Sequence, residues 1–134
     1  MLVGQGDAVH ATTNIRIRLE KRRDGIQLAR TAGDLDALGA PVLREYLDER
    51  ILPGHDFVLD LDEVTFLGSA GMKVLLDTDD RAARRHVRWA LVGNNRPVAR
   101  PLWATGLSDR LPLQPDVPAA IRELTSQPRV LHAL

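Results

Sequence analysis

The chain has 134 residues, 44% of them hydrophobic, so it is long enough to bury one core and too short for two ordinary domains. Its 18 basic and 18 acidic residues give a formal net charge of zero, which removes the electrostatic reason to expect nucleic acid or an anionic membrane as the main partner. The lack of cysteine in the sequence excludes disulfides, thiolate metal sites and cysteine nucleophiles.

One domain over residues 14–125 is predicted, between a flexible leader over 1–13 and a tail over 126–134. The leader shows no hydrophobic periodicity, and no linker rich in Gly, Pro or Ser divides the domain. The sequence has neither a signal peptide nor a run of about 18 apolar residues, so we expect a cytoplasmic protein.

The first elements predicted are a hairpin and a helix. Apolar and charged residues alternate over 14–20, which is typical of a strand with one buried face. Asp24-Gly25 suits a tight hairpin turn, and a second strand follows from Ile26. Apolar residues at three- and four-residue spacing then predict a helix, and Pro41, which fits the first turn of a helix, favours a start near residue 39.

The middle of the chain predicts two buried strands around a helix. Residues 57–62 are dense in branched apolar side chains, which is typical of a central strand with parallel neighbours. A second buried strand is expected over 87–92. The helix between them is expected over 72–85, with a buried face formed by Gly71, Val74, Leu75, Thr78 and Ala82.

The last third predicts smaller elements. A third helix after Asn95 must be short or kinked, because Pro101 falls within it. Leu111 and Leu113 indicate a brief edge strand, and Asp116 opens a final helix. The order β-β-α-β-α-β-α-β-α predicts an α/β domain with a mixed, mostly parallel sheet, about four helices and an opening antiparallel hairpin.

The most informative stretch joins the predicted central strand to the next helix. Gly68-Ser69-Ala70-Gly71 brings small residues to the free amides at a helix N-terminus, where the helix dipole stabilises negative charge. A phosphate on Ser69 is therefore favourable there. An alternative is that Ser69 is a plain N-cap, since serine is among the preferred N-cap residues.

Three landmarks carry a family resemblance. They are Gly33-Asp34-Leu35-Asp36, the block from Phe57 to Met72 that contains Leu-Gly-Ser-Ala-Gly, and Thr105-Gly106-Leu107. With these landmarks the span from Ile15 to Leu124 resembles a STAS domain, named for sulfate transporters and anti-sigma factor antagonists. In the antagonists a partner kinase phosphorylates the serine that follows an aspartate at the start of a helix. The matching residue here is Ser69.

The resemblance implies a function in transcription regulation, for example in a stress response, by partner switching. By this resemblance, we expect the protein to bind an anti-sigma factor serine kinase when Ser69 is unphosphorylated, and so to free a sigma factor. Phosphorylation is expected to end that binding, and a protein phosphatase is expected to reset the switch. The resemblance implies no cofactor, no metal and no enzyme activity. The residues expected to contact the partner are Gly68, Met72, Lys73, Leu76, Asp34 and Asp36.

Two points qualify that site. Met72 and Leu76 share one helix face with Ser69, but both are also candidates for the core. The family has an acidic residue directly before the serine, whereas this chain has Gly68 at that position. Glycine admits backbone angles that other residues avoid, so we expect Gly68 to loosen the loop that holds Ser69.

A serine hydrolase is the first alternative, because a serine at a strand-to-helix turn resembles the Gly-x-Ser-x-Gly nucleophile elbow. The residue two before Ser69 is Leu67, however, and not glycine. A triad also needs a histidine. The histidines fall in the predicted leader, two connections and the tail, at His10, His55, His86 and His132. We therefore expect no hydrolase.

Charged clusters supply two further alternatives. The aspartates available to a metal are Asp56, Asp60, Asp62, Asp77, Asp79 and Asp80. An EF-hand counted from Asp60 would need glycine where Thr65 stands, so solvated or capping carboxylates are expected instead. The basic cluster consists of Arg81, Arg84, Arg85 and Arg88, and the nearby carboxylates favour a solvated helix face.

A last alternative stays within the predicted fold. It is a STAS domain without a phosphorylation cycle, acting as an assembly subunit or as a ligand-binding module. A membrane-transporter role is not expected, because the sequence contains no apolar segment of membrane-spanning length. The sequence leaves the choice between a switch and such a module open.

Overall fold

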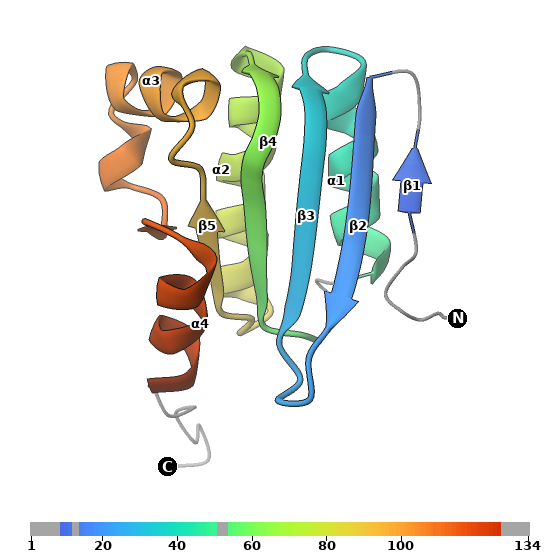
Figure 1. Ribbon diagram of the computed structural model, residues 1–134, viewed down its shortest axis with the longest axis vertical. Coiled ribbons are helices and arrows are strands. Elements are labelled where there is room, and N and C mark those ends of the chain that lie inside the picture. The colour runs from blue at the N-terminus through green and yellow to red at the C-terminus, as the bar shows by residue number, and fades with distance from the viewer. Residues whose placement is uncertain (1–8, 12–13, 51–53, 127–134) are drawn as a thin grey trace.

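A mixed six-stranded sheet forms the centre of the molecule, and its strands lie side by side in chain order (Figure 1). The computed structural model describes residues 9–11, 14–50 and 54–126. The strands are β1 (Val9–Ala11), β2 (Ile15–Lys21), β3 (Gln27–Leu35), β4 (Phe57–Leu67), β5 (Trp89–Val92) and β6 (Leu113–Gln114). Strands β1 to β3 pair antiparallel, whereas β3 to β6 pair parallel.

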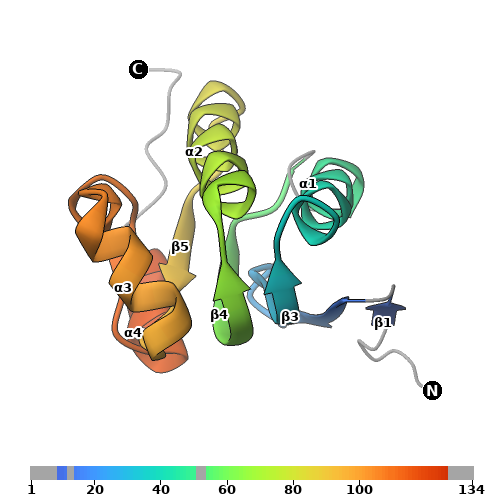
Figure 2. The ribbon, with the colours of Figure 1, turned by 90° about the horizontal axis from the view of Figure 1, so that it is seen from above.

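Helices cover both faces of this sheet. They are α1 (Gly39–Arg50), α2 (Ser69–Arg84), α3 (Arg96–Ala104) and α4 (Val117–Ser126), with a short 3-10 helix, η1 (Leu107–Asp109). Figure 2 shows α1 and α2 on one face and α4 on the other, and α3 lies at the edge where the parallel strands end (Figure 1). No helix among the described residues is long and apolar enough to cross a membrane.

Strand β4 is buried on both faces because its apolar side chains point both ways. Phe57, Leu59 and Leu61 belong to the main core under α1 and α2, whereas Val58 belongs to a smaller core under α4. The predicted central strand with parallel neighbours is therefore confirmed, although it continues to Leu67. The extra length carries the chain to the edge of the sheet where α2 begins.

Most predicted boundaries are confirmed by local hydrogen bonds. The Asp24 carboxylate accepts the Ile26 amide in the β2–β3 turn at 3.1 Å. Helix α1 begins at Gly39 as expected, and the predicted short third helix has nine residues with Pro101 inside it. The Asp116 carboxylate accepts the Ala119 amide at 2.8 Å at the start of α4. The predicted α/β class and the mixed, mostly parallel sheet are confirmed.

Two expectations about boundaries are wrong. Residues 9–11, assigned to a flexible leader, form β1, which pairs with β2 through His10 and Ile17. Helix α2 begins at Ser69 and not near residue 72, because the small residues that suggested a loop are compatible with the first helical turn. The remaining leader and the tail over 127–134 lie outside the described residues.

Candidate functional site

The connection between β4 and α2 holds Ser69 at an exposed edge of the sheet. The Gly68 amide donates to the carbonyl oxygen of Leu35, at the end of β3, at 3.1 Å. Gly71 is buried, and a Cβ on it would lie 2.8 Å from the Leu35 Cβ, so only a very small residue lets α2 start this close to β3. Backbone contacts with the neighbouring strand therefore determine where Ser69 lies.

Ser69 is the first residue of α2 and not its N-cap. The N-cap is Gly68, which has no side chain to accept a hydrogen bond from the helix. The N-cap alternative for Ser69 is therefore wrong. Because the first-turn amides of a helix lack intrahelical acceptors, they face the exposed Ser69 region with no side-chain cap over them. An anion at Ser69 meets these amides and the positive end of the helix dipole.

Gly68 does not adopt an unusual backbone conformation. Its φ of −97° and ψ of −173° are extended values open to any residue, so the expectation that it loosens the loop finds no support in its angles. The position is instead restricted by Phe66, since a Cβ on Gly68 would lie 2.8 Å from the Phe66 ring. Glycine lets that ring pack against the backbone immediately before Ser69.

The predicted docking face on α2 is partly core and partly surface. Met72 and Leu76 are half-buried and pack against the main core, so both interpretations of them hold in part. Lys73 is exposed, and its ammonium group lies 3.5 Å from the Asp77 carboxylate. The Thr105 hydroxyl lies 3.8 Å from the Met72 sulfur, which places the end of α3 beside this face.

Asp34 and Asp36 lie at the same edge of the sheet as Ser69, because β3 and β4 run parallel and end there. The Thr65 hydroxyl donates to the Asp34 carboxylate at 2.6 Å. The Asp36 carboxylate accepts the Gly39 amide at 2.8 Å and so caps α1. Both carboxylates stabilise the local backbone, and contact with a partner stays a prediction for them.

The histidines do not form a triad with Ser69 in the described structure. His86 follows the end of α2, about 24 Å along the helix axis from Ser69 at 1.5 Å per residue. His55 precedes β4, at the opposite edge of the sheet, and His10 lies in the edge strand β1. His132 is outside the described residues. The arrangement offers Ser69 no general base among these side chains.

The aspartates considered for a metal bind protein groups. Asp60 pairs with Arg30 at 2.9 Å, and burial raises the pKa of the Asp60 carboxyl despite the hydrogen bond that it accepts from the Asp62 amide. The other aspartates also have partners within the protein. Asp56 contacts Arg88, Asp62 the Asn94 amide, Asp77 both Arg44 and Lys73, Asp79 the Trp89 indole, and Asp80 contacts Arg84. The described residues contain no group of three or more His, Cys, Asp or Glu side chains placed to hold a metal.

The basic cluster around the end of α2 is largely paired. Arg81 binds Asp48, Arg84 binds Asp80, and Arg88 binds Asp56. These ion pairs neutralise most of the positive charge of the cluster, in agreement with the expectation of a solvated helix face.

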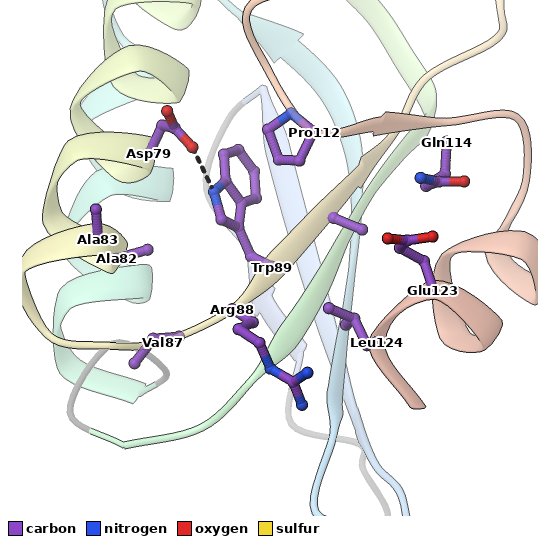
Figure 3. A pocket seen from close by; sticks show the side chains of 11 residues that line it. Asp79, Ala82, Ala83, Val87, Arg88, Trp89, Pro112, Gln114, Glu123 and Leu124 are labelled. Atoms are coloured by element: carbon purple, nitrogen blue, oxygen red, sulfur yellow. Dashed lines mark hydrogen bonds between the residues drawn. The ribbon is translucent and has the colours of Figure 1, made fainter. Parts of the chain in front are cut away.

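A cleft of about 390 Å³ lies between the second half of α2, β5 and α4 (Figure 3). Trp89 points into it, and its indole N–H donates to Asp79 at 3.0 Å. Asp79 is about 15 Å along α2 from Ser69, so the cleft is separate from the Ser69 edge, by which we mean the end of the sheet where β3 and β4 finish and α2 begins. A ligand-binding module would use this cleft, but Asp79 and Arg88 already bind other side chains.

Trp89→Phe is expected to lower the free energy of unfolding by about 1 kcal/mol, because it removes the hydrogen bond to Asp79. The ring of Phe57 stacks on Trp89 with centroids 5.5 Å apart, and phenylalanine keeps part of that contact. Thermal unfolding followed by circular dichroism measures the change as a fall in Tm of a few degrees. An unchanged Tm would show that this hydrogen bond contributes nothing to stability.

Comparison with known proteins connects this geometry to a family. The profile described as STAS domain matches residues 19–120, which is more than half of the chain. The chain belongs to the STAS domain family. The match lies within the span from Ile15 to Leu124 that carried the resemblance, so the predicted family is confirmed.

The relatives of this STAS domain carry regulatory names. An anti-sigma F factor antagonist of Paenibacillus polymyxa is 29% identical over 113 residues, which cover 83% of this chain and 96% of the relative. An anti-sigma-B factor antagonist of Listeria monocytogenes is 32% identical over 98 residues, which cover 72% of this chain and 85% of the relative. The crystal structure of an anti-sigma factor antagonist from Mycobacterium paratuberculosis superposes with a TM-score of 0.75 at 28% identity, covering 83% of this chain and 94% of that one.

Proposed function

We propose that this STAS domain is an anti-sigma factor antagonist that acts by partner switching in the cytoplasm. With Ser69 unphosphorylated it binds an anti-sigma factor that has serine kinase activity, and a sigma factor is released. A phosphate on Ser69 ends the binding, and a protein phosphatase restores it. The protein is a binding component of this cycle and catalyses none of its steps.

One observation carries the proposal: Ser69 is exposed and begins α2 directly after a glycine N-cap. A kinase can reach its hydroxyl, and the phosphate that results lies near helix amides and the positive end of a dipole. Lys73, one turn along the helix, is exposed on the same side, and its ammonium group, which lies 3.5 Å from the Asp77 carboxylate, is within one turn of Ser69. The relatives named as anti-sigma factor antagonists support the same role.

The phosphate is expected to change the interface and not the fold. It adds about two negative charges beside a face that also presents the half-buried side chains of Met72 and Leu76. Burying such charges against a partner costs several kcal/mol unless the partner supplies matching cations. The free protein meets no such cost, because its helix amides stabilise the charge.

A release assay tests this function. The unphosphorylated protein is added to purified complexes of anti-sigma factor kinases with their sigma factors, all from the same genome, and free sigma factor is followed by size-exclusion chromatography. We expect release from one of these complexes in proportion to the protein added. If the protein binds none of the anti-sigma factors and releases no sigma factor, the proposed function is wrong.

Met72→Lys is expected to weaken binding of that anti-sigma factor about tenfold, which corresponds to about 1.4 kcal/mol, because it places a charge on the apolar part of the docking face. A small fall in Tm is also expected, since Met72 packs partly against the core. Isothermal titration calorimetry and thermal unfolding separate the two effects.

The matched control is Ala83→Lys, which adds the same charge to an exposed position of α2 three turns further on. It is expected to bind as the wild type does. Equal affinities of Met72→Lys and wild type would place the docking face elsewhere.

A further inference from the structure

A groove lies beside Ser69, between the end of β4 and α3, with a volume of about 380 Å³. We call it the α3 groove, and the residues that define it are Phe66, Arg96, Pro97, Arg100 and Pro101. Phe66 is 50% exposed, and its ring also packs against Gly68, the residue before Ser69. The α3 groove and the Ser69 edge therefore form one continuous surface.

The α3 groove carries positive charge that the protein itself does not neutralise. Arg96 and Arg100 are exposed, and neither forms an ion pair with a carboxylate among the residues that the structure describes. They are four residues apart on one helix face, where like charges repel. Arg96 also stands at the N-terminal end of α3, where the helix dipole is positive. An anion in the groove relieves each of these unfavourable interactions.

The same surface exposes aromatic side chains. Trp103 is 78% exposed and follows Arg96 and Arg100 on one face of α3, at positions i, i+4 and i+7. The large hydrophobic side chains exposed in the described parts of the chain are Leu38, Phe66 and Trp103. Leu38 follows β3, Phe66 is the penultimate residue of β4, and Trp103 lies in α3, the helix that follows β5. Apolar exposure is thus concentrated at the edge that holds Ser69, which is typical of a protein interface.

We propose that the α3 groove is a second contact site for the anti-sigma factor, and that it receives an acidic segment carrying a large apolar side chain. The inference rests on the proposed function and adds the chemistry of the partner. Carboxylates of the segment pair with Arg96 and Arg100, since a guanidinium binds a carboxylate through two parallel hydrogen bonds. The apolar side chain lies between the Phe66 ring and the prolines of α3.

A nucleic acid fits this surface less well than a protein segment. The chain has no net positive charge, and two arginines offer few phosphate contacts along a backbone. The lining of the groove also includes apolar side chains, those of Phe66, Pro97 and Pro101. A peptide segment with both acidic and apolar side chains matches the positive charge of the arginines and the apolar part of the lining.

The test compares Arg100→Glu and Phe66→Ala with the wild type, in calorimetric titrations of the anti-sigma factor that the wild type binds. Each variant is expected to bind about tenfold more weakly. Arg100 is exposed, so Arg100→Glu is expected to leave Tm unchanged, whereas Phe66→Ala is expected to lower Tm slightly because half of the Phe66 side chain is buried. Arg100→Gln adds a readout that a purely structural role would not alter. Its affinity is expected to depend less steeply on NaCl concentration than that of the wild type.

The matched control is Arg23→Glu, which makes the same charge change at an exposed position in the β2–β3 turn, at the opposite end of the sheet. It is expected to bind as the wild type does. If Ser69→Glu loses binding while both groove variants bind like the wild type, this inference is wrong and the proposed function stands. If the wild type binds no anti-sigma factor, both are wrong. If Arg100→Glu loses affinity only for a single-stranded RNA oligonucleotide, the occupant is nucleic acid and the inference is also wrong.

Discussion

Ser69→Glu is expected to weaken binding of the anti-sigma factor about a hundredfold, which corresponds to about 2.8 kcal/mol, while the protein stays folded. The glutamate carboxylate stands in for part of the phosphate charge at the first position of α2. In the free protein this charge lies near unpaired amides and the positive end of the helix dipole, so Tm is expected to stay the same or rise slightly. Isothermal titration calorimetry and thermal unfolding measure the two quantities.

Two variants at the same position separate charge from size. Ser69→Gln has nearly the shape of the glutamate without its charge, and it is expected to bind much more tightly than Ser69→Glu. Ser69→Ala is expected to bind like the wild type and to stay bound when ATP is added, because it has no hydroxyl to phosphorylate. If Ser69→Gln loses as much affinity as Ser69→Glu, the effect is steric and the electrostatic account of the switch fails.

Gly33→Ala is expected to destabilise the protein strongly, lowering the free energy of unfolding by about 3 kcal/mol and Tm by about 10 °C. Gly33 has a φ of +106°, which disfavours any side chain, and an added Cβ would overlap the Asn14 carbonyl oxygen. The next residue, Asp34, donates its amide to that same carbonyl at 2.7 Å. The substitution therefore disturbs the edge of the sheet next to Ser69.

Gly25→Ala is the matched control, because Gly25 has a similar φ of +87° in the β2–β3 turn but open space around its Cβ position. It reports the backbone strain alone, which is about 1 kcal/mol. The difference between the two losses in free energy of unfolding measures the cost of the clash between an added Cβ on Gly33 and the Asn14 carbonyl oxygen. Equal stability losses would show that this clash adds nothing beyond the backbone angle.

The sequence was sufficient to predict the elements whose causes are local. Hydrophobic period and turn residues predicted the hairpin at Gly25, the helix start at Gly39 and the buried central strand β4. The face of α2 expected to be buried, formed by Gly71, Val74, Leu75, Thr78 and Ala82, is buried. The family followed from the landmark around Ser69, because a specific motif at a strand-to-helix junction contains more information than composition does.

Features that depend on contacts across the fold were missed. Strand β1 has only three residues, too few to show the alternation of apolar and polar side chains that predicts a strand. Its conformation depends on its hydrogen bonds with β2. The backbone of Gly68 is ordinary, and what restricts the position is the ring of Phe66. The α3 groove needs the end of β4 to lie beside α3, which no local pattern shows.

Phosphate transfer to Ser69, measured together with the state of the complex, tests the central claim most directly. The protein is mixed with the anti-sigma factor kinase that it binds, Mg²⁺ and ATP are added, and samples are split between phosphopeptide mapping and size-exclusion chromatography. The account predicts that phosphate accumulates on Ser69 and that the complex dissociates at the same rate. Phosphate on another residue, or a complex that persists when Ser69 is fully phosphorylated, would contradict it.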